Sequence, residues 1–169
     1  MIEVLLAATL VVVGVLAFTR SIVASIETTS TTSEAARANE AARQMLETLR
    51  GTDFDDVFAL FNATGADDPG GADSAPGAAF AVAGLAPLAN DADGLPGEIV
   101  FPAGATASEL REDVDDLRLG MPRDLNGDGA VDANDHAADY ELLPVLVRVE
   151  WRGANGPGRV ELKTILADY

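Results

Sequence analysis

The densest group of side chains that could bind a ligand lies in a twelve-residue loop, residues 124–135. Oxygen-bearing side chains occupy its first, third, fifth, ninth and twelfth positions: Asp124, Asn126, Asp128, Asp132 and Asp135. The backbone carbonyl of Ala130, at the seventh position, would supply a further oxygen. Carboxylates crowded this closely repel one another unless a cation lies between them. A hard divalent ion that accepts flexible oxygen coordination is Ca²⁺, so the loop predicts a calcium site.

The remaining loop positions fit the same interpretation. Gly129, at the sixth position, permits the sharp turn that brings the ligands round one centre, and Val131, at the eighth, is expected to point into the core. The spacing resembles the calcium loops of EF-hands and dockerins, with Asp135 in place of the usual terminal glutamate. The alternative is an acidic, solvated turn. We expect His136 to be a surface residue of a helix over residues 136–143 rather than a ligand.

Glu3 is a second charged group whose position implies chemistry, because it precedes an apolar run. Residues 4–18 carry no charge, and their apolar side chains cover every face of a helix, which must therefore lie in lipid or among protein. Continued past Arg20 to residue 26, the run reaches membrane-spanning length. Its large apolar members are Val4, Leu5, Leu6, Leu10, Val11, Val12, Val13, Val15, Leu16 and Phe18.

A carboxylate at the start of such a helix is costly unless it meets a cation. A secretory signal peptide or a simple membrane anchor would carry basic residues on this flank, where the chain has Glu3. The natural counter-ion is a free amino terminus created by removal of a basic leader. The alternative is a solvated carboxylate in the lipid headgroup layer.

Composition disfavours several classes of function. The net charge of −17 repels phosphate backbones, so nucleic-acid binding is not expected. The absence of cysteine excludes disulfides, thiolate metal sites and cysteine nucleophiles, and the single histidine leaves little material for a general base. The chain is therefore not expected to be an enzyme.

The apolar run continues into a patterned helix. Residues 28–33 are all Thr or Ser, and residues 34–50 follow with a narrow apolar stripe that small side chains dominate. The stripe consists of Ala35, Ala38, Ala42, Met45 and Leu49. Gly51 is a plausible C-cap, and residues 54–61 predict a short amphipathic helix. We expect the stripe to pack on a C-terminal domain.

The rest of the chain predicts a small antiparallel sheet. Residues 65–97 read as a long Ala/Gly/Pro-rich loop with a possible short strand at 80–82, and residues 98–101 as a strand. An acidic helix is expected over 108–117. Alternation predicts a hairpin over residues 145–166, with Val145, Val147, Val149 and Trp151 on one face of its first strand. The expected fold class is α+β, a long N-terminal helix on a small antiparallel sheet.

The sequence Ile2-Glu3-Val4-Leu5 before a wholly apolar run, and the exit Leu-Arg-Gly-Thr-Asp at residues 49–53, resemble type IV pilins and type II secretion pseudopilins. The resemblance implies processing by a prepilin peptidase, with the chain beginning about two residues inside the usual mature end. It gives Glu3 the role of neutralising the amine of a neighbouring subunit, and it makes the apolar residues from Val4 to Phe18 the filament core. It also suggests calcium as a structural clamp of the head, where many pilins use a disulfide.

The first hypothesis is a structural subunit of a type IV pilus-like extracellular filament. It waits in the bacterial inner membrane, binds other copies of itself, other pilins and the inner-membrane assembly platform, and then joins the filament. The alternatives are a pseudopilin of a periplasmic pseudopilus and a membrane-tethered calcium-binding surface module that never polymerises. The expected divisions are an apolar half-helix (1–26), an amphipathic half-helix with its exit (27–62) and a globular head (63–169).

Overall fold

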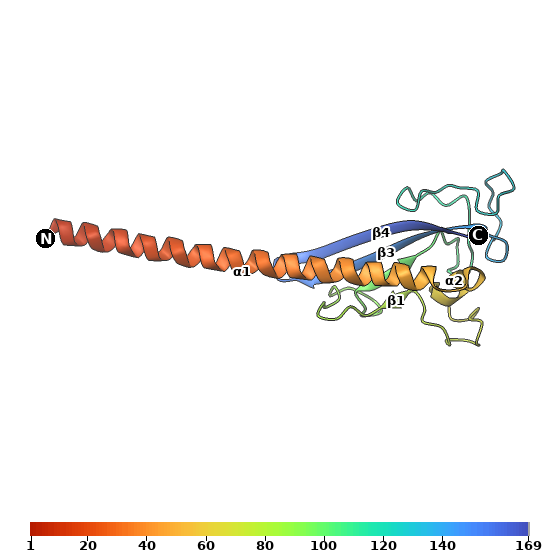
Figure 1. Ribbon diagram of the computed structural model, residues 1–169, viewed down its shortest axis with the longest axis horizontal. Helices are drawn as coiled ribbons and strands as arrows, with labels where there is room; N and C mark the ends of the chain where they lie inside the picture. The colour runs from red at the N-terminus through yellow and green to blue at the C-terminus, as the bar shows by residue number, and fades with distance from the viewer. Residues whose placement is uncertain (169) are drawn as a thin grey trace.

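A computed structural model describes residues 1–168. Its dominant element is a single helix, α1 (Ile2–Arg50), which at ~1.5 Å per residue is roughly 74 Å long. The N-terminal half of α1 projects alone, and the C-terminal half lies along a small head (Figure 1). A short second helix, α2 (Phe54–Phe61), follows at the far end of the head. The predicted α+β class is confirmed.

The head is built round one antiparallel sheet. Its strands are β1 (Ala79–Phe80), β2 (Gly97–Val100), β3 (Leu142–Gly153) and β4 (Gly156–Ala167), and they pair in the order β1-β2-β3-β4. β3 and β4 form the predicted hairpin, extended at both ends, in a register that opposes Leu142 to Ala167 and Gly153 to Gly156. This hairpin lies along the C-terminal half of α1 (Figure 1).

The core forms between the hairpin and the docked half of α1. The predicted face of β3 is buried, since Val145, Val147 and Val149 are fully covered and Trp151 is 4% exposed. On α1, Ala38, Ala42 and Leu49 of the predicted stripe are buried, with Ala35 and Met45 partly buried against them. Leu46 joins this buried set, although the predicted stripe omitted it. Alanine on the helix permits close approach of the sheet, and the valines fill the interface.

Two predicted helices are wrong. Residues 108–117 contain no helix: Leu110 and Glu112 are both buried two residues apart, which is the period of an extended chain. Residues 136–143 are not helical either, because a turn follows His136 and β3 already begins at Leu142. In both segments, long-range hydrogen bonds to residues 124–135 replace the local bonds of a helix.

Candidate functional site

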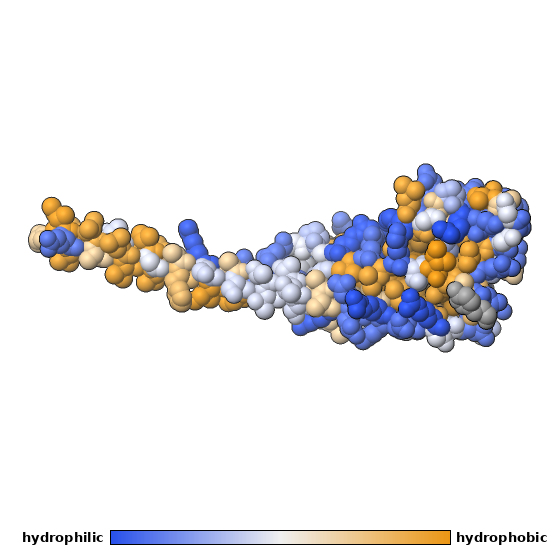
Figure 2. Space-filling view, turned by 45° about the horizontal axis from the view of Figure 1, so that its top comes forward, coloured by the Kyte–Doolittle hydropathy of each residue, from blue (hydrophilic) through white to orange (hydrophobic). Residues whose placement is uncertain are grey.

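The N-terminal half of α1 is bare. Every residue from Met1 to Thr29 is exposed, including Leu10 at 66% and Phe18 at 68%. In Figure 2, apolar surface covers most of the projecting helix, with few polar side chains, whereas polar and apolar areas are mixed over the head. By length and composition the helix is apolar enough to cross a membrane, and none of its most apolar stretch is buried. It is therefore a candidate membrane anchor. Glu3 lies in its first turn, where the helix dipole favours a negative charge.

A polar collar of Thr and Ser, residues 28–33, separates the bare half from the docked half. Thr28 and Thr29 donate their hydroxyls to the carbonyls four residues earlier, at 2.9 and 2.8 Å, so these hydroxyls are hydrogen-bonded within the helix itself. The head begins here, because the Asn155 side-chain amide at the hairpin tip donates to the Thr31 hydroxyl at 3.0 Å. One turn further on, the Trp151 indole N–H donates to Glu34 at 3.2 Å.

In the first half of the predicted calcium loop, side chains hydrogen-bond to nearby backbone amides and hold the turn. Asp124 accepts the amide hydrogens of Gly127 and Gly129 at 2.7 and 2.8 Å, one on each carboxylate oxygen. Asn126 and Asp128 each accept the amide two residues on, at 3.2 and 2.8 Å. The turn needs a positive φ at Gly127 (73°) and Gly129 (88°), which glycine adopts without strain. The sharp turn expected at Gly129 is therefore present.

The second half of the loop is arranged differently from the prediction. One oxygen of Asp135 accepts the amides of Leu110 and Ala137, at 3.0 and 3.1 Å, and so ties the loop to the chain before it. Asp132 turns toward His136, with 3.2 Å between Oδ1 and Nε2. Val131 is 49% exposed, so its predicted place in the core is wrong. Its position is at the outer surface of the loop.

Sequence reasoning missed Glu112, which is 1% exposed. Its Oε1 accepts the Leu125 amide at 2.6 Å and the Asn126 amide at 3.4 Å, and its Oε2 accepts the Asp132 amide at 3.0 Å. One carboxylate therefore fastens both the start and the ninth position of the loop. Glu112 lies twelve residues before the loop, and no local pattern marks it, because only the fold brings the two together.

His136 is buried at 4% exposure, so its predicted surface position is wrong. Its Nδ1 lies 3.1 Å from Asp139 Oδ1, and its Nε2 lies 3.8 Å from Glu112 Oε2 as well as close to Asp132. Burial alone lowers the pKa of His136, but hydrogen bonds to Asp132 and Asp139 and the charge on Glu112 outweigh it, and the net direction is upward. The Asn134 amide and His136 together lower the pKa of Asp132.

Glu112, Asp132 and His136 together could hold a metal ion. One ligating atom from each lies within 4.8 Å of the other two, and Glu112 and His136 are buried. This group shares Asp132 with the predicted set and does not contain Asp124, Asp128 or Asp135. The predicted region therefore contains a group that could hold a metal ion, built partly from residues that the sequence did not indicate.

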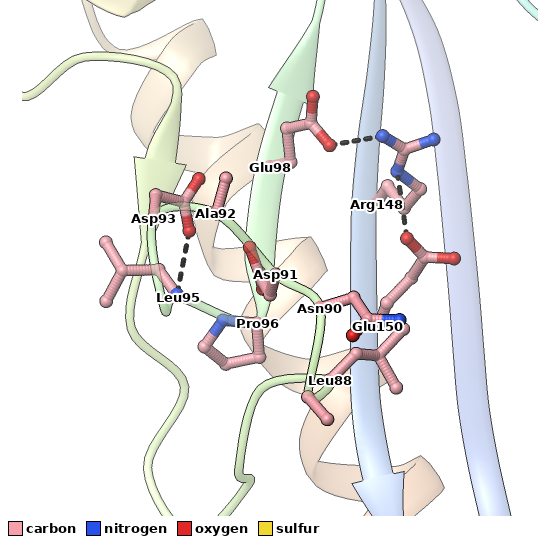
Figure 3. Close-up of a pocket in the computed structure, with 11 residues that line it drawn as sticks. Leu88, Asn90, Asp91, Ala92, Asp93, Leu95, Pro96, Glu98, Arg148 and Glu150 are labelled. Carbon is pink, nitrogen blue, oxygen red and sulfur yellow. Dashed lines mark hydrogen bonds and ion pairs between the residues drawn. The ribbon is translucent and has the colours of Figure 1, made fainter.

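A separate acidic hollow of about 440 Å³ lies beside β2 and β3. Figure 3 shows Glu98 of β2 facing Arg148 of β3, while Arg148 Nε lies 3.6 Å from Glu150. Asp91 and Asp93 complete its acidic lining, and desolvation together with Asp93 raises the pKa of Asp91. Among the described residues that line the hollow there is no serine, histidine or lysine. Its charged groups are carboxylates and the guanidinium of Arg148, which is already paired with Glu98 and Glu150.

A comparison of the chain with protein-family models, curated proteins and solved structures found no match. The resemblance of the N-terminal residues to pilins therefore stays a prediction. The proposals below rest on two features of the structure, the bare half of α1 and the group of ligands round Asp132.

Proposed function

We propose that the chain is a structural, non-catalytic subunit of a type IV pilus-like filament. The observation that carries this proposal is the division of one continuous helix, whose residues 1–29 are exposed while residues 38–49 help to form the core of the head. A helix that is apolar on every face cannot remain in water, so its first half needs a partner that surrounds it.

Lipid and other copies of the chain can each serve as that partner. Burying one large aliphatic side chain from water contributes roughly 1.5–3 kcal/mol, and the bare half carries more than ten of them. In the inner membrane, lipid covers this surface. In a filament, the bare halves of neighbouring copies would cover one another, and the heads would remain outside, where their acidic surface is solvated.

Glu3 favours the move of the bare half from lipid into a filament. Lipid leaves its carboxylate without a counter-ion, whereas a neighbouring copy that supplies an amino terminus neutralises it. A contact of one surface with a different surface on the next copy builds a closed ring where the rotation between copies closes, and an open helical series where it does not. The Glu3 contact therefore favours an assembly of many copies over a two-fold dimer, and the filament is the open form of that assembly.

For the head, we propose that residues 124–135 bind calcium as a structural clamp. Asp124, Asn126 and Asp128 lie in one tight turn and offer only oxygens, as Ca²⁺ prefers. A carboxylate that accepts amide hydrogens keeps further lone pairs for a cation, so these bonds are compatible with ligation. The Ala130 carbonyl and the second oxygen of Asp135 would complete the set. In loops of this kind the residue at the ninth position, here Asp132, commonly reaches the ion through a water.

Electron microscopy of sheared cell-surface material tests the filament, with Glu3→Ala and Glu3→Asp compared against the natural chain. We expect fibres from the natural chain, little or no fibre from Glu3→Ala and a partial yield from Glu3→Asp, which keeps the charge. Membrane fractionation should show that all three chains insert equally.

Three results would count against this proposal. A normal fibre yield from Glu3→Ala would remove the pairing argument. A natural chain that inserts in the membrane and never gives a fibre would favour a tethered surface module instead, and fibres confined to the periplasm would indicate a pseudopilus.

A further inference from the structure

Three atoms that can bind a cation lie close together beside residues 124–135. One of them is a nitrogen, which a calcium site does not require. They are Glu112 Oε2, Asp132 Oδ1 and His136 Nε2. The nitrogen lies 3.2 Å from the Asp132 oxygen and 3.8 Å from the Glu112 oxygen. Calcium takes oxygen ligands, so a buried imidazole aimed at two carboxylates suits a different cation.

The tautomer of His136 decides which ring nitrogen is available to a cation. Asp139 is a carboxylate that can only accept, so the 3.1 Å contact with its Oδ1 places a hydrogen on His136 Nδ1. The opposite ring nitrogen then faces two further acceptors. A positive centre must lie between them, either a proton on Nε2 or a metal ion.

The spacing and the surroundings match a transition-metal site. Bonds of about 2.0–2.1 Å in a tetrahedral site separate nitrogen and oxygen ligands by roughly 3.3 Å. The 3.2 Å between His136 Nε2 and Asp132 matches this value, the 3.8 Å to Glu112 is longer, and all three ligating atoms lie within 4.8 Å of one another. A carboxylate on the far nitrogen of a histidine is the usual outer support of a metal ligand, and Asp139 supplies it. Glu112 is fixed in turn by the Leu125 and Asp132 amides.

We infer that Glu112, Asp132 and His136 form a second cation site that takes a divalent transition ion of the zinc type, with Asp139 as the residue that orients His136. The site is separate from the oxygen-only calcium loop and adjoins it through Asp132. Asp132, whose side chain is 38% exposed, gives the ion a path from solvent, and a water would complete the coordination. This inference does not depend on filament assembly.

Cobalt titration of the purified full chain in detergent tests it, in the presence of excess Ca²⁺ so that the calcium loop is saturated. We expect one equivalent of Co²⁺ to bind with visible absorption bands typical of tetrahedral nitrogen and oxygen ligands, and Zn²⁺ to displace it. His136→Gln should weaken Co²⁺ binding by at least about 100-fold, and Asp139→Asn by about 10- to 100-fold, the range for an outer-shell partner.

Asp128→Asn is the matched control, because it changes the calcium loop and leaves the three ligands in place. Its Co²⁺ affinity should be unchanged while its calcium affinity falls. The inference is overturned if no Co²⁺ binds while Ca²⁺ is in excess, or if His136→Gln binds Co²⁺ as tightly as the natural chain. A test without any variant covers the case in which His136→Gln fails to fold: with Ca²⁺ in excess, Zn²⁺ should raise the melting temperature of the natural chain, and an unchanged melting temperature means that the cluster holds only a proton.

Discussion

The two halves of α1 have the same backbone conformation and opposite environments. The bare half carries large aliphatic residues such as Leu10 and Leu16, which are 66% and 57% exposed. The docked half buries the small Ala38 and Ala42 together with two leucines, Leu46 and Leu49. Large side chains exposed on all faces can meet partners from any direction, and alanine on one face allows close approach by a single sheet. The residues of the docked half therefore suit packing on the head of the same chain, whereas those of the bare half suit packing on lipid or on other copies.

The largest effect that tests this comparison comes from matched leucine truncations. Leu49→Ala removes a side chain that is 1% exposed, and should lower the free energy of unfolding of the head by ~2–5 kcal/mol. Leu16→Ala, on the bare half, should leave it unchanged. The fluorescence of Trp151, the single tryptophan, reports head unfolding in urea with the chain held in detergent. Equal losses in the two variants would show that the halves are not independent.

Calcium should stabilise the head alone. An ion that binds only the folded loop adds about 2.7 kcal/mol when its concentration is 100 times its dissociation constant. Chelation should therefore lower the melting temperature of the head, while the helical circular dichroism contributed by the bare half in detergent persists. Asp128→Asn should remove most of the calcium effect. A melting temperature that is the same with calcium and with chelator would argue against a structural calcium ion.

A smaller effect is expected from enlarging an alanine. Ala42→Leu forces a bulky side chain into the interface with the sheet, where Ala42 has no exposed surface, and should cost ~1–3 kcal/mol. Ala8→Leu adds the same atoms to the bare half and should leave head unfolding unchanged. Urea unfolding of both chains measures the difference. A stable Ala42→Leu chain would mean that close packing on α1 matters less than proposed.

Elements whose contacts are local or periodic could be predicted from the sequence. The alternation through Val145, Val147 and Val149 gave the buried face of β3, and the steps between Ala38, Ala42 and Leu49 gave the docked face of α1. Each pattern marks the face of one helix or strand that packs on a single partner surface, so a short stretch of sequence is enough to predict that buried face.

The connection between β2 and β3 could not be predicted in the same way. Its acidic segments have helical potential, but Glu112 and Asp135 instead satisfy backbone amides that are far away in sequence. The calcium-loop spacing indicated the turn at Gly129 and a region where a group that could hold a metal ion is found, yet it gave no sign that Asp132 would turn to His136. Those contacts exist only once the chain has closed on itself.

The central claim is that the bare half of α1 is covered by other copies of the chain. A cryo-EM map of fibres sheared from cells tests this most directly. It should show a helical assembly in which residues 2–29 of many copies form an axial bundle, with the Glu3 carboxylates paired inside and the heads outside. Fibres in which this segment faces solvent, or cultures that yield only single chains in the membrane and no fibre, would contradict the account.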